Sequence, residues 1–477
     1  MSPTIQQSRV RRRALVRLLA PLREVRWGGL LLGVLLLVGL TGCMTGDGVH
    51  AAFTREFARD PAVVDLDLSS ADNMPFTGGV GGEVTLRSDL GEAELRAFAE
   101  RVREFGADHG GAAADQAASS DPSRVRITLL VDEWRLPVLM DPEAGNALLE
   151  VFGELRGDAR VQTGGFGTRD FTDSATSARL EVADGETAFA LLAESPELFA
   201  GLGRMPEVTV ATVPGVPERV VLTGAPGAWS DRAGAGYAAL GAAAPLTAFE
   251  ADPSSVTVTL ARETDLERAE EIARVALHLS DGGDVFFQSD LVTLFPRASG
   301  GSARALLADF PADARAGVES LWTDDRAIQL RAADARVLAD LAVAVDASPV
   351  ADGLGPVTIR VGQADEPTLA IQGDPGALAA QASTAIALGE RSEVARVVLS
   401  PGFSMELVTT GTPSDADLAA YAVPLKALAE PGDRVCIDAA RQGSFCVTAA
   451  EQLTLAELTE RAARDGRPFV DAWNARP

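Results

Sequence analysis

The cysteines of this chain have the most clearly defined chemistry. Cys436 and Cys446 lie in two short runs of alternating apolar and polar residues that flank Ala440-Arg441-Gln442-Gly443, a pattern that predicts a β-hairpin. In the symmetric register both cysteines lie on the polar face, directly opposite each other, with Cα atoms ~4.5 to 5.5 Å apart. We therefore predict a Cys436–Cys446 disulfide. A redox or metal pair is the alternative, but the spacing is wider than C-x-x-C and no histidine is near.

The third cysteine, Cys43, stands in a different context. The N-terminal residues are basic as far as Arg26, and Trp27 to Leu40 then form an apolar run. This run has the length of a signal peptide and is shorter than the ~20 residues that span a bilayer as a helix. It ends in Leu40-Thr41-Gly42-Cys43. The segment resembles the signal of bacterial lipoproteins, whose lipobox is an aliphatic residue, a small residue, Gly or Ala, and then Cys.

The resemblance covers about the first tenth of the chain. It implies that residues 1–42 are a signal peptide, that cleavage falls between Gly42 and Cys43, and that the Cys43 thiol carries diacylglycerol. Two acyl chains at ~0.8 kcal/mol per buried CH₂ would hold the protein permanently in lipid. We therefore expect it on the outer face of the cytoplasmic membrane. An uncleaved anchor is the alternative, and Arg12-Arg13 leaves open whether export follows the Sec or the twin-arginine route.

The charge and composition limit the classes of partner. Without the signal the chain carries 35 basic and 67 acidic residues, a net charge of −32. This acidity argues against nucleic acid, which requires clustered Lys and Arg, and against binding by charge to an anionic membrane surface. Aromatic residues make up 5% of the chain, which leaves few platforms for stacking on sugars or bases. Lys426 is the only lysine, and the wealth of Ala, Gly, Asp and Val is typical of a high-GC, for example actinobacterial, genome.

The histidines are not spaced for catalysis or metal binding. We expect His50 in a tether after the lipobox, His109 in a loop, and His278 on the polar face of a helix. None of them has a second histidine at zinc-ligand spacing. The sequence also contains no G-x-S-x-G nucleophile elbow. We therefore predict no catalytic residues, no metal and no cofactor.

The chain also contains glycine-rich and acidic runs of the kind that can form ligand loops. Thr77–Gly82 and Gly164–Gly167 lie between or within strands of hairpins, whereas a phosphate loop opens a helix after a strand. We interpret both runs as bends or bulges. Asp65-x-Asp67 and Asp281–Asp284 lack the spaced ligands and the closing Glu of an EF-hand calcium loop.

One pattern returns every ~40 residues: two short alternating strands, a turn and an Ala-rich amphipathic helix. We count ten such units. The clearest helices are predicted over Glu92–Phe105, Thr187–Leu202, Leu266–Leu279, Ala377–Leu388, Asp415–Leu428 and Leu455–Ala463. Capping side chains mark helix starts, namely Thr264 with Glu267, Ser414 with Asp417, Thr454 with Glu457, and Asp141 before Pro142.

Two units in tandem supply four strands and two helices, enough to lay both helices on one face of an antiparallel sheet. With the frame shifted by one strand, the order becomes βαββαβ, the ferredoxin-like split βαβ arrangement. The predicted fold class is thus α+β, with about five two-layer modules. Spacing leaves open whether the modules are separate or share continuous sheets. The predicted segments are a tether at 43–61 and modules at 62–157 (with a mobile loop at 107–123), 158–244, 245–314, 315–390 and 391–477.

Taken together, these features favour a non-enzymatic, membrane-tethered protein whose modules contact another envelope protein. Arg126 and Thr128 alternate with Val125, Ile127 and Leu129, a pattern that suits a sheet with one open face. The alternative is a lipoprotein that captures a small molecule or glycan for a membrane partner, which requires a cleft with convergent polar groups and aromatics. A third possibility is a hydrolase with two carboxylates ~5 to 9.5 Å apart in a cleft.

Overall fold

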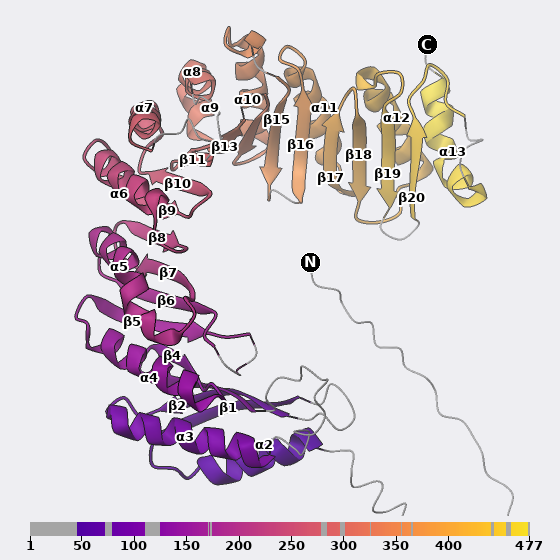
Figure 1. Ribbon diagram of the computed structural model, residues 1–477. Coiled ribbons are helices and arrows are strands. Elements are labelled where there is room, and N and C mark those ends of the chain that lie inside the picture. The colour runs from indigo at the N-terminus through magenta and orange to yellow at the C-terminus, as the bar shows by residue number, and fades with distance from the viewer. Residues whose placement is uncertain are drawn as a thin grey trace, which may run out of the picture. The chain divides into compact units, whose positions relative to one another are not determined.

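The computed structural model describes residues 45–475 apart from short gaps at 72–78, 110–124, 170, 172–173, 278–283, 296–300, 325, 354, 364–365, 440–442 and 455–458 (Figure 1). The chain divides into two compact units, which are described separately. The first comprises Met1–Asp132 with Asp170–Thr172, and the second comprises Glu133–Arg169 with Asp173–Pro477. The predicted signal, Gly42, Cys43 and His278 lie outside the described residues.

Within the described residues, two strands followed by a helix recur ten times, in agreement with the predicted repeat. The strands are β1 (Val63–Ala71), β2 (Gly79–Leu86), β3 (Val125–Val131), β4 (Trp134–Pro137), β5 (Val161–Gly167), β6 (Ser177–Val182), β7 (Glu207–Thr212), β8 (Arg219–Thr223), β9 (Leu246–Ala251), β10 (Ser255–Leu260), β11 (Asp284–Gln288), β12 (Val292–Leu294), β13 (Val318–Thr323), β14 (Ile328–Ala332), β15 (Val357–Gly362), β16 (Pro367–Gly373), β17 (Val394–Ser400), β18 (Ser404–Thr409), β19 (Arg434–Ala439) and β20 (Gly443–Thr448). The helices are α2 (Thr45–Phe57), α3 (Glu92–His109), α4 (Pro142–Gly157), α5 (Gly185–Leu198), α6 (Ala228–Gly241), α7 (Leu266–Ala276), α8 (Gly301–Asp309), α9 (Ala312–Ala316), α10 (Ala335–Ala347), α11 (Leu378–Gly389), α12 (Asp415–Leu428) and α13 (Glu460–Asn474).

The first unit contains β1, β2 and β3, with β1 antiparallel and β3 parallel to β2. Part of the predicted tether is here a helix, α2, whose Phe53 and Phe57 are fully buried. Their rings meet Phe98 and Phe105 of α3, with Phe53–Phe105 centroids 5.1 Å apart and Phe57–Phe98 centroids 5.5 Å apart. The spacing of four residues between Phe53 and Phe57 places both on one helix face, which explains why this segment folds onto the unit.

In the second unit every strand pairs with the next strand along the chain. The two strands of each hairpin are antiparallel, as in β5–β6 and β17–β18. The two strands that flank each helix are parallel and directly adjacent, as in β6–β7 across α5 and β18–β19 across α12. The same alternation continues through the remaining pairs from β4 to β20, so these strands form one continuous sheet.

This pairing corrects the prediction of ferredoxin-like modules. In a split βαβ unit a third strand lies between the two strands that the helix connects. Here nothing lies between them, because β6 bonds to β7 and β16 bonds to β17. The mixed α/β content and the repeat were predicted from periodicity, whereas the strand order depends on which edge each hairpin joins. Hydrophobic alternation alone does not encode that choice.

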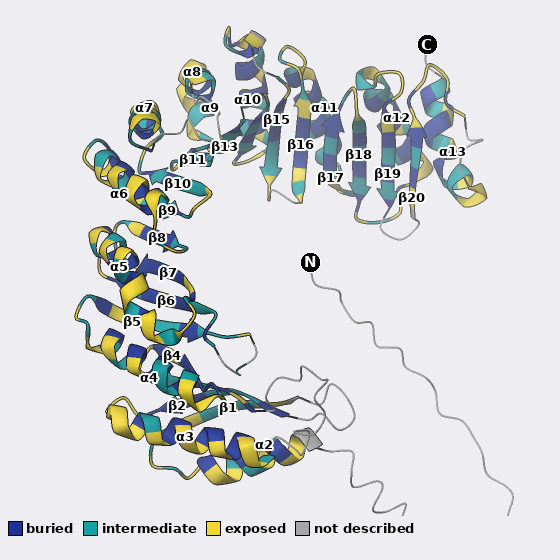
Figure 2. Cartoon of the chain, viewed as in Figure 1, coloured by how far each residue is buried: buried dark blue, intermediate teal, exposed yellow. Residues whose placement is uncertain are grey.

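All helices of the second unit lie on one face of its sheet (Figure 1). A right-handed crossover between adjacent parallel strands, repeated in the same direction along a sheet, places every helix on the same side. Burial follows this layering, because along β14 Ile328, Leu330 and Ala332 are buried whereas Gln329 and Arg331 between them are partly exposed. Figure 2 shows the same alternation of buried and intermediate residues along the strands. We call the other side, which carries none of the described helices, the open face.

Several predicted helix ends differ from the structure. The capping box of Ser414 with Asp417 and the Asp141 cap are present. By contrast, α7 begins at Leu266 after a 3₁₀ turn over Glu263–Asp265, so Thr264 is not its cap. The last helix, α13, begins at Glu460 with Thr459 as its cap, and the predicted start at 455, with Glu457, lies outside the described residues. Helix α13 buries Phe469, Val470 and Trp473, beyond the predicted end at Ala463.

Candidate functional site

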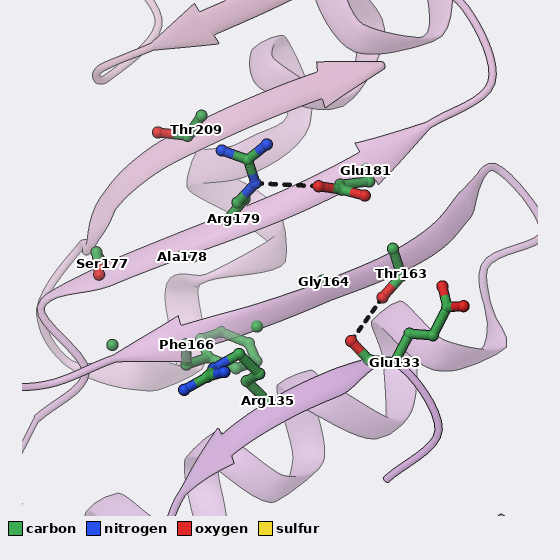
Figure 3. Close-up of a pocket in the computed structure, with 12 residues that line it drawn as sticks. Glu133, Arg135, Thr163, Gly164, Phe166, Ser177, Ala178, Arg179, Glu181 and Thr209 are labelled. Carbon is green, nitrogen blue, oxygen red and sulfur yellow. Dashed lines mark hydrogen bonds and ion pairs between the residues drawn. The ribbon is translucent and has the colours of Figure 1, made fainter. Parts of the chain in front are cut away.

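The open face of the second unit is hollowed over β4, β5, β6 and β7 (Figure 3). The cavity has a volume of ≈ 510 Å³, within the ~300–1,000 Å³ range of ligand sites. We call it the β4–β7 hollow. Its lining residues are Glu133, Arg135, Thr163, Gly164, Gly165, Phe166, Gly167, Ser177, Ala178, Arg179, Glu181 and Thr209.

The floor of the hollow is formed by glycines of β5. Gly165 pairs with Arg135 of β4 on one side and with Arg179 of β6 on the other. A Cβ atom at Gly165 would lie 2.9 Å from Arg135 Cβ and 3.1 Å from the Arg135 carbonyl oxygen. A Cβ atom at Gly167 would collide with Ser177 Oγ. The missing side chains therefore create the depression, and the neighbouring residues occupy the space at its edges.

The strand register arranges the polar side chains in a row. Beyond Gly165, Arg179 pairs with Thr209 of β7, and Thr209 pairs with Thr223 of β8. The Thr209 and Thr223 hydroxyl oxygens are 3.2 Å apart. Neighbouring strands are ~4.8 Å apart, so Arg135 and Arg179 stand roughly 10 Å apart across the glycine. Figure 3 shows both arginine side chains beside the glycine strand.

A second row places carboxylates next to the arginines. Glu181 pairs with Thr163, and Thr163 Oγ1 donates a hydrogen bond to the Glu133 carbonyl oxygen at 2.8 Å. Arg179 Nε and Glu181 Oε1 form an ion pair at 3.1 Å, in which the Arg179 side chain is 57% exposed and that of Glu181 is 17% exposed. The hollow therefore presents positive and negative groups side by side, with Ser177 and Thr209 hydroxyls at its edge.

An ion-pair cluster fixes the start of the glycine strand. Arg160, directly before β5, bonds Asp158 at the end of α4 and Glu194 of α5, both at 2.7 Å. These hydrogen bonds to Arg160 lower the pKa values of Asp158 and Glu194 below their ordinary values. Because one guanidinium joins two helices to the entry of β5, the strand that forms the floor is held at its N-terminal end.

The arrangement is suited to holding a polar chain. Guanidinium groups donate hydrogen bonds in a planar fork, hydroxyls donate and accept, and carboxylates accept. A ligand that offers acceptors and donors at short intervals would match both rows, whereas a purely anionic ligand would meet Glu133 and Glu181. Glu133 and Glu181 are also two carboxylates in one hollow, but Glu181 is engaged by Arg179.

The residues that the sequence had singled out lie apart from this hollow. Cys436 and Cys446 pair in register on β19 and β20 and form the predicted disulfide, with Cα atoms 4.1 Å apart. His50 lies in α2, and His109 ends α3 with its ring stacked on Phe105 at 4.0 Å instead of lying in a loop. Lys426 donates to the Trp473 carbonyl oxygen at 2.9 Å, which ties α12 to α13.

Sequence reasoning named the glycines of β5 but not their role. The interpretation as a bend or bulge is wrong for Gly164–Gly167, because the register shift of β5 falls earlier, between Val161 and Thr163. The available signal was the pair of arginines at alternate positions of the flanking strands, Arg135 and Arg179. Their convergence on Gly165 depends on strand order, which the sequence left open.

The described part of the chain has neither a metal-ligand cluster nor a membrane-spanning helix. No group of three or more His, Cys, Asp or Glu in it could hold a metal ion. None of its helices is both long and apolar enough to cross a membrane. No protein-family model, curated protein or solved structure matches the chain.

Proposed function

We propose that this chain is a lipid-anchored, extracytoplasmic binding protein, without catalytic activity of its own, that holds another envelope protein on the open face of its sheet. The anchor in this proposal is Cys43, supported by the fit of residues 40–43 to a lipobox. The extracytoplasmic location is further supported by the Cys436–Cys446 disulfide, since structural disulfides persist in oxidising compartments.

The single observation that carries the proposal is the uncovered sheet face. Helices bury one side of the sheet from β4 to β20, while the other side presents Thr, Arg, Glu and Gln to solvent. All-parallel sheets have both faces covered and antiparallel sheets commonly leave one face solvated, and this sheet alternates the two kinds of pair. A sheet face that is uncovered by helices and contains the β4–β7 hollow has the form expected of a surface that binds a partner.

The partner in this proposal is an extended segment of a protein. A polypeptide offers a carbonyl acceptor and an amide donor at every residue. The carbonyl groups would accept hydrogen bonds from the guanidinium groups of Arg135 and Arg179, and the amide groups would donate to the carboxylates of Glu133 and Glu181. Charged rows of both signs also favour a partner whose own charges alternate, because complementary potentials set register and exclude wrong partners.

Capture of a small polar molecule is the second candidate function. The volume of the β4–β7 hollow, ≈ 510 Å³, and its convergent polar groups favour it. In this case the occupant would be a compact zwitterion rather than a chain, and the hollow alone would contain it.

Site-specific photocrosslinking in cells distinguishes the open face from the helical face. A photoreactive residue in place of Thr209, in the hollow, is expected to give one discrete crosslinked protein species. The matched control is the same residue in place of Val275 of α7, which is 71% exposed on the helical side and is expected to give none. Filling the hollow with Gly165→Trp should abolish the Thr209 crosslink.

Three results would overturn the proposal. These are no crosslink from Thr209, the same species from Thr209 and Val275, or a crosslink that survives Gly165→Trp. The small-molecule alternative predicts no protein crosslink and a bound compound that is released on denaturation of the wild-type chain, but not of the Gly165→Trp chain.

A further inference from the structure

A second feature of the open face is a row of uncharged side chains on the neighbouring strands β11 to β16. Strand pairing sets these residues side by side, one per strand, and each is partly or fully exposed. We call them the neutral row. In order along the row they are Gln288, Thr293, Trp322, Gln329, Thr358 and Gln372.

An aromatic cluster adjoins the start of this row. Phe295, which follows β12, has its ring centroid 4.6 Å from that of Trp322 and 6.0 Å from that of Phe286 on β11. Phe295 is 38% exposed, and its backbone N–H donates to the Thr323 carbonyl oxygen at 3.0 Å. Aromatic residues are only 5% of the chain, so three of them gathered on a solvent-facing sheet surface need an explanation other than core packing.

The neutral row differs in charge from its surroundings. The chain has a net charge of −26, yet the six residues of the row carry no ionisable group. The adjacent row contains two arginines that pair in register, Arg331 of β14, which is bound to Glu319 at 2.6 Å, and Arg360 of β15. Along the neutral row itself, amide and hydroxyl groups that donate and accept would suit a ligand rich in hydroxyls.

We propose that the neutral row and its aromatic cluster bind a neutral polysaccharide. Trp322 and Phe295 would pack against the apolar face of a sugar ring, and Gln329, Thr358 and Gln372 would hydrogen-bond hydroxyls of the following residues. One side chain stands at every strand, ~4.8 Å apart, a step comparable to the length of one pyranose residue in an extended chain. The site lies on strands other than those of the β4–β7 hollow and does not depend on a protein partner there.

Affinity electrophoresis of the full chain tests this proposal. The chain is run through native gels that contain a soluble neutral glucan, mannan, galactan or arabinan, with a polysaccharide-free gel as reference. We expect retardation in at least one of the four, and a loss of affinity of tenfold or more in Trp322→Ala. Trp229→Ala is the matched control, because Trp229 lies on α6 on the helical side, and we expect its retardation to equal that of the wild type.

A second variant keeps the test independent of folding. Gln329→Glu places a charge in the neutral row without removing bulk, and we expect it to weaken retardation by tenfold or more while the denaturation midpoint of the chain stays unchanged. The proposal is overturned if the wild type is retarded by none of the four polysaccharides, or if Trp322→Ala and Gln329→Glu bind as tightly as the wild type. It is also overturned if Trp229→Ala weakens binding as strongly as Trp322→Ala.

Discussion

Arg135 of β4 and Arg179 of β6 stand on either side of Gly165, and each is the register partner of that glycine. This relationship makes the β4–β7 hollow depend on one missing side chain. Arg135 and Arg179 are 44 positions apart in sequence. Gly165 of β5 lies between them and contributes only its backbone to this row of residues.

Gly165→Ala should destabilise the chain because the new methyl group would lie 2.9 Å from Arg135 Cβ. Overpacking of this kind costs about 1–3 kcal/mol in the free energy of unfolding. Gly157→Ala, at the end of α4, is the matched control, since nothing lies within 4 Å of a Cβ atom there. Urea denaturation followed by tryptophan fluorescence compares them, and equal midpoints for the two variants would refute the steric role of Gly165.

Removal of the disulfide should weaken the end of the sheet. Cys436 and Cys446 are separated by 10 residues, and a crosslink over such a loop contributes about 3 kcal/mol by restricting the unfolded chain. We expect the double variant Cys436→Ala, Cys446→Ala to exchange its β19, β20 and α13 amides faster, while amides of β5 and β6 keep their wild-type rates. Unchanged exchange at β19 and β20 would contradict this prediction.

The cluster around Arg391 should make stability depend on pH. Arg391 contacts Glu393 Oε1 at 2.8 Å and Asp417 Oδ1 at 2.6 Å, and Tyr421 donates to Glu393 at 2.8 Å. Arg391 lowers the pKa of Glu393 below its ordinary value of 4.5, and the Ser414 hydrogen bond together with Arg391 lowers the pKa of Asp417. The carboxylates are therefore more stable as anions in the folded chain than in the unfolded one.

This contribution is complete above pH 4.5 and is lost as the pH falls through the lowered pKa values of the folded state. Arg391→Gln should therefore cost about 1 kcal/mol at neutral pH, a modest value because the three side chains are 26–33% exposed. The difference from wild type should shrink as the pH falls below 4.5. Denaturation of both chains across this pH range provides the measurement, and a difference that grew towards acid pH would have the wrong sign.

The repeated build was predictable because burial on a single face leaves a period in the sequence. Ser414 with Asp417 and Asp141 with Pro142 identified helix starts correctly, since capping requires particular side chains next to free backbone amides. The Cys436–Cys446 pairing was predictable for the same local reason, since a short hairpin fixes its own register.

The order of the strands and the candidate site were not predictable in this way. Whether β7 joins the edge next to β6 or lies one strand away changes no local pattern, yet it decides between a continuous sheet and separate modules. The convergence of Arg135 and Arg179 on Gly165 follows only from that order. Helix α2 was not predicted, because a tether is the expectation after a lipobox, although Phe53 and Phe57, four residues apart, carry the helical pattern.

Maturation and lipid attachment should depend on one sulfur atom. We expect Cys43→Ser to accumulate as an uncleaved precursor that keeps residues 1–42, because the lipobox requires the thiol. The Cys446→Ser chain is the control, since it also lacks one cysteine but keeps Cys43, and it should be cleaved and lipidated like the wild type. Equal cleavage of the two variants would argue against an anchor at Cys43.

The most direct test of the central claim, a chain fastened outside the cytoplasm by its own lipid, is mass spectrometry of the N-terminal peptide of the protein purified from membranes. We predict a peptide that begins at Cys43 and carries the added mass of a diacylglycerol on its sulfur. A free Cys43 thiol, or a peptide that still contains leader residues before Cys43, would contradict the account.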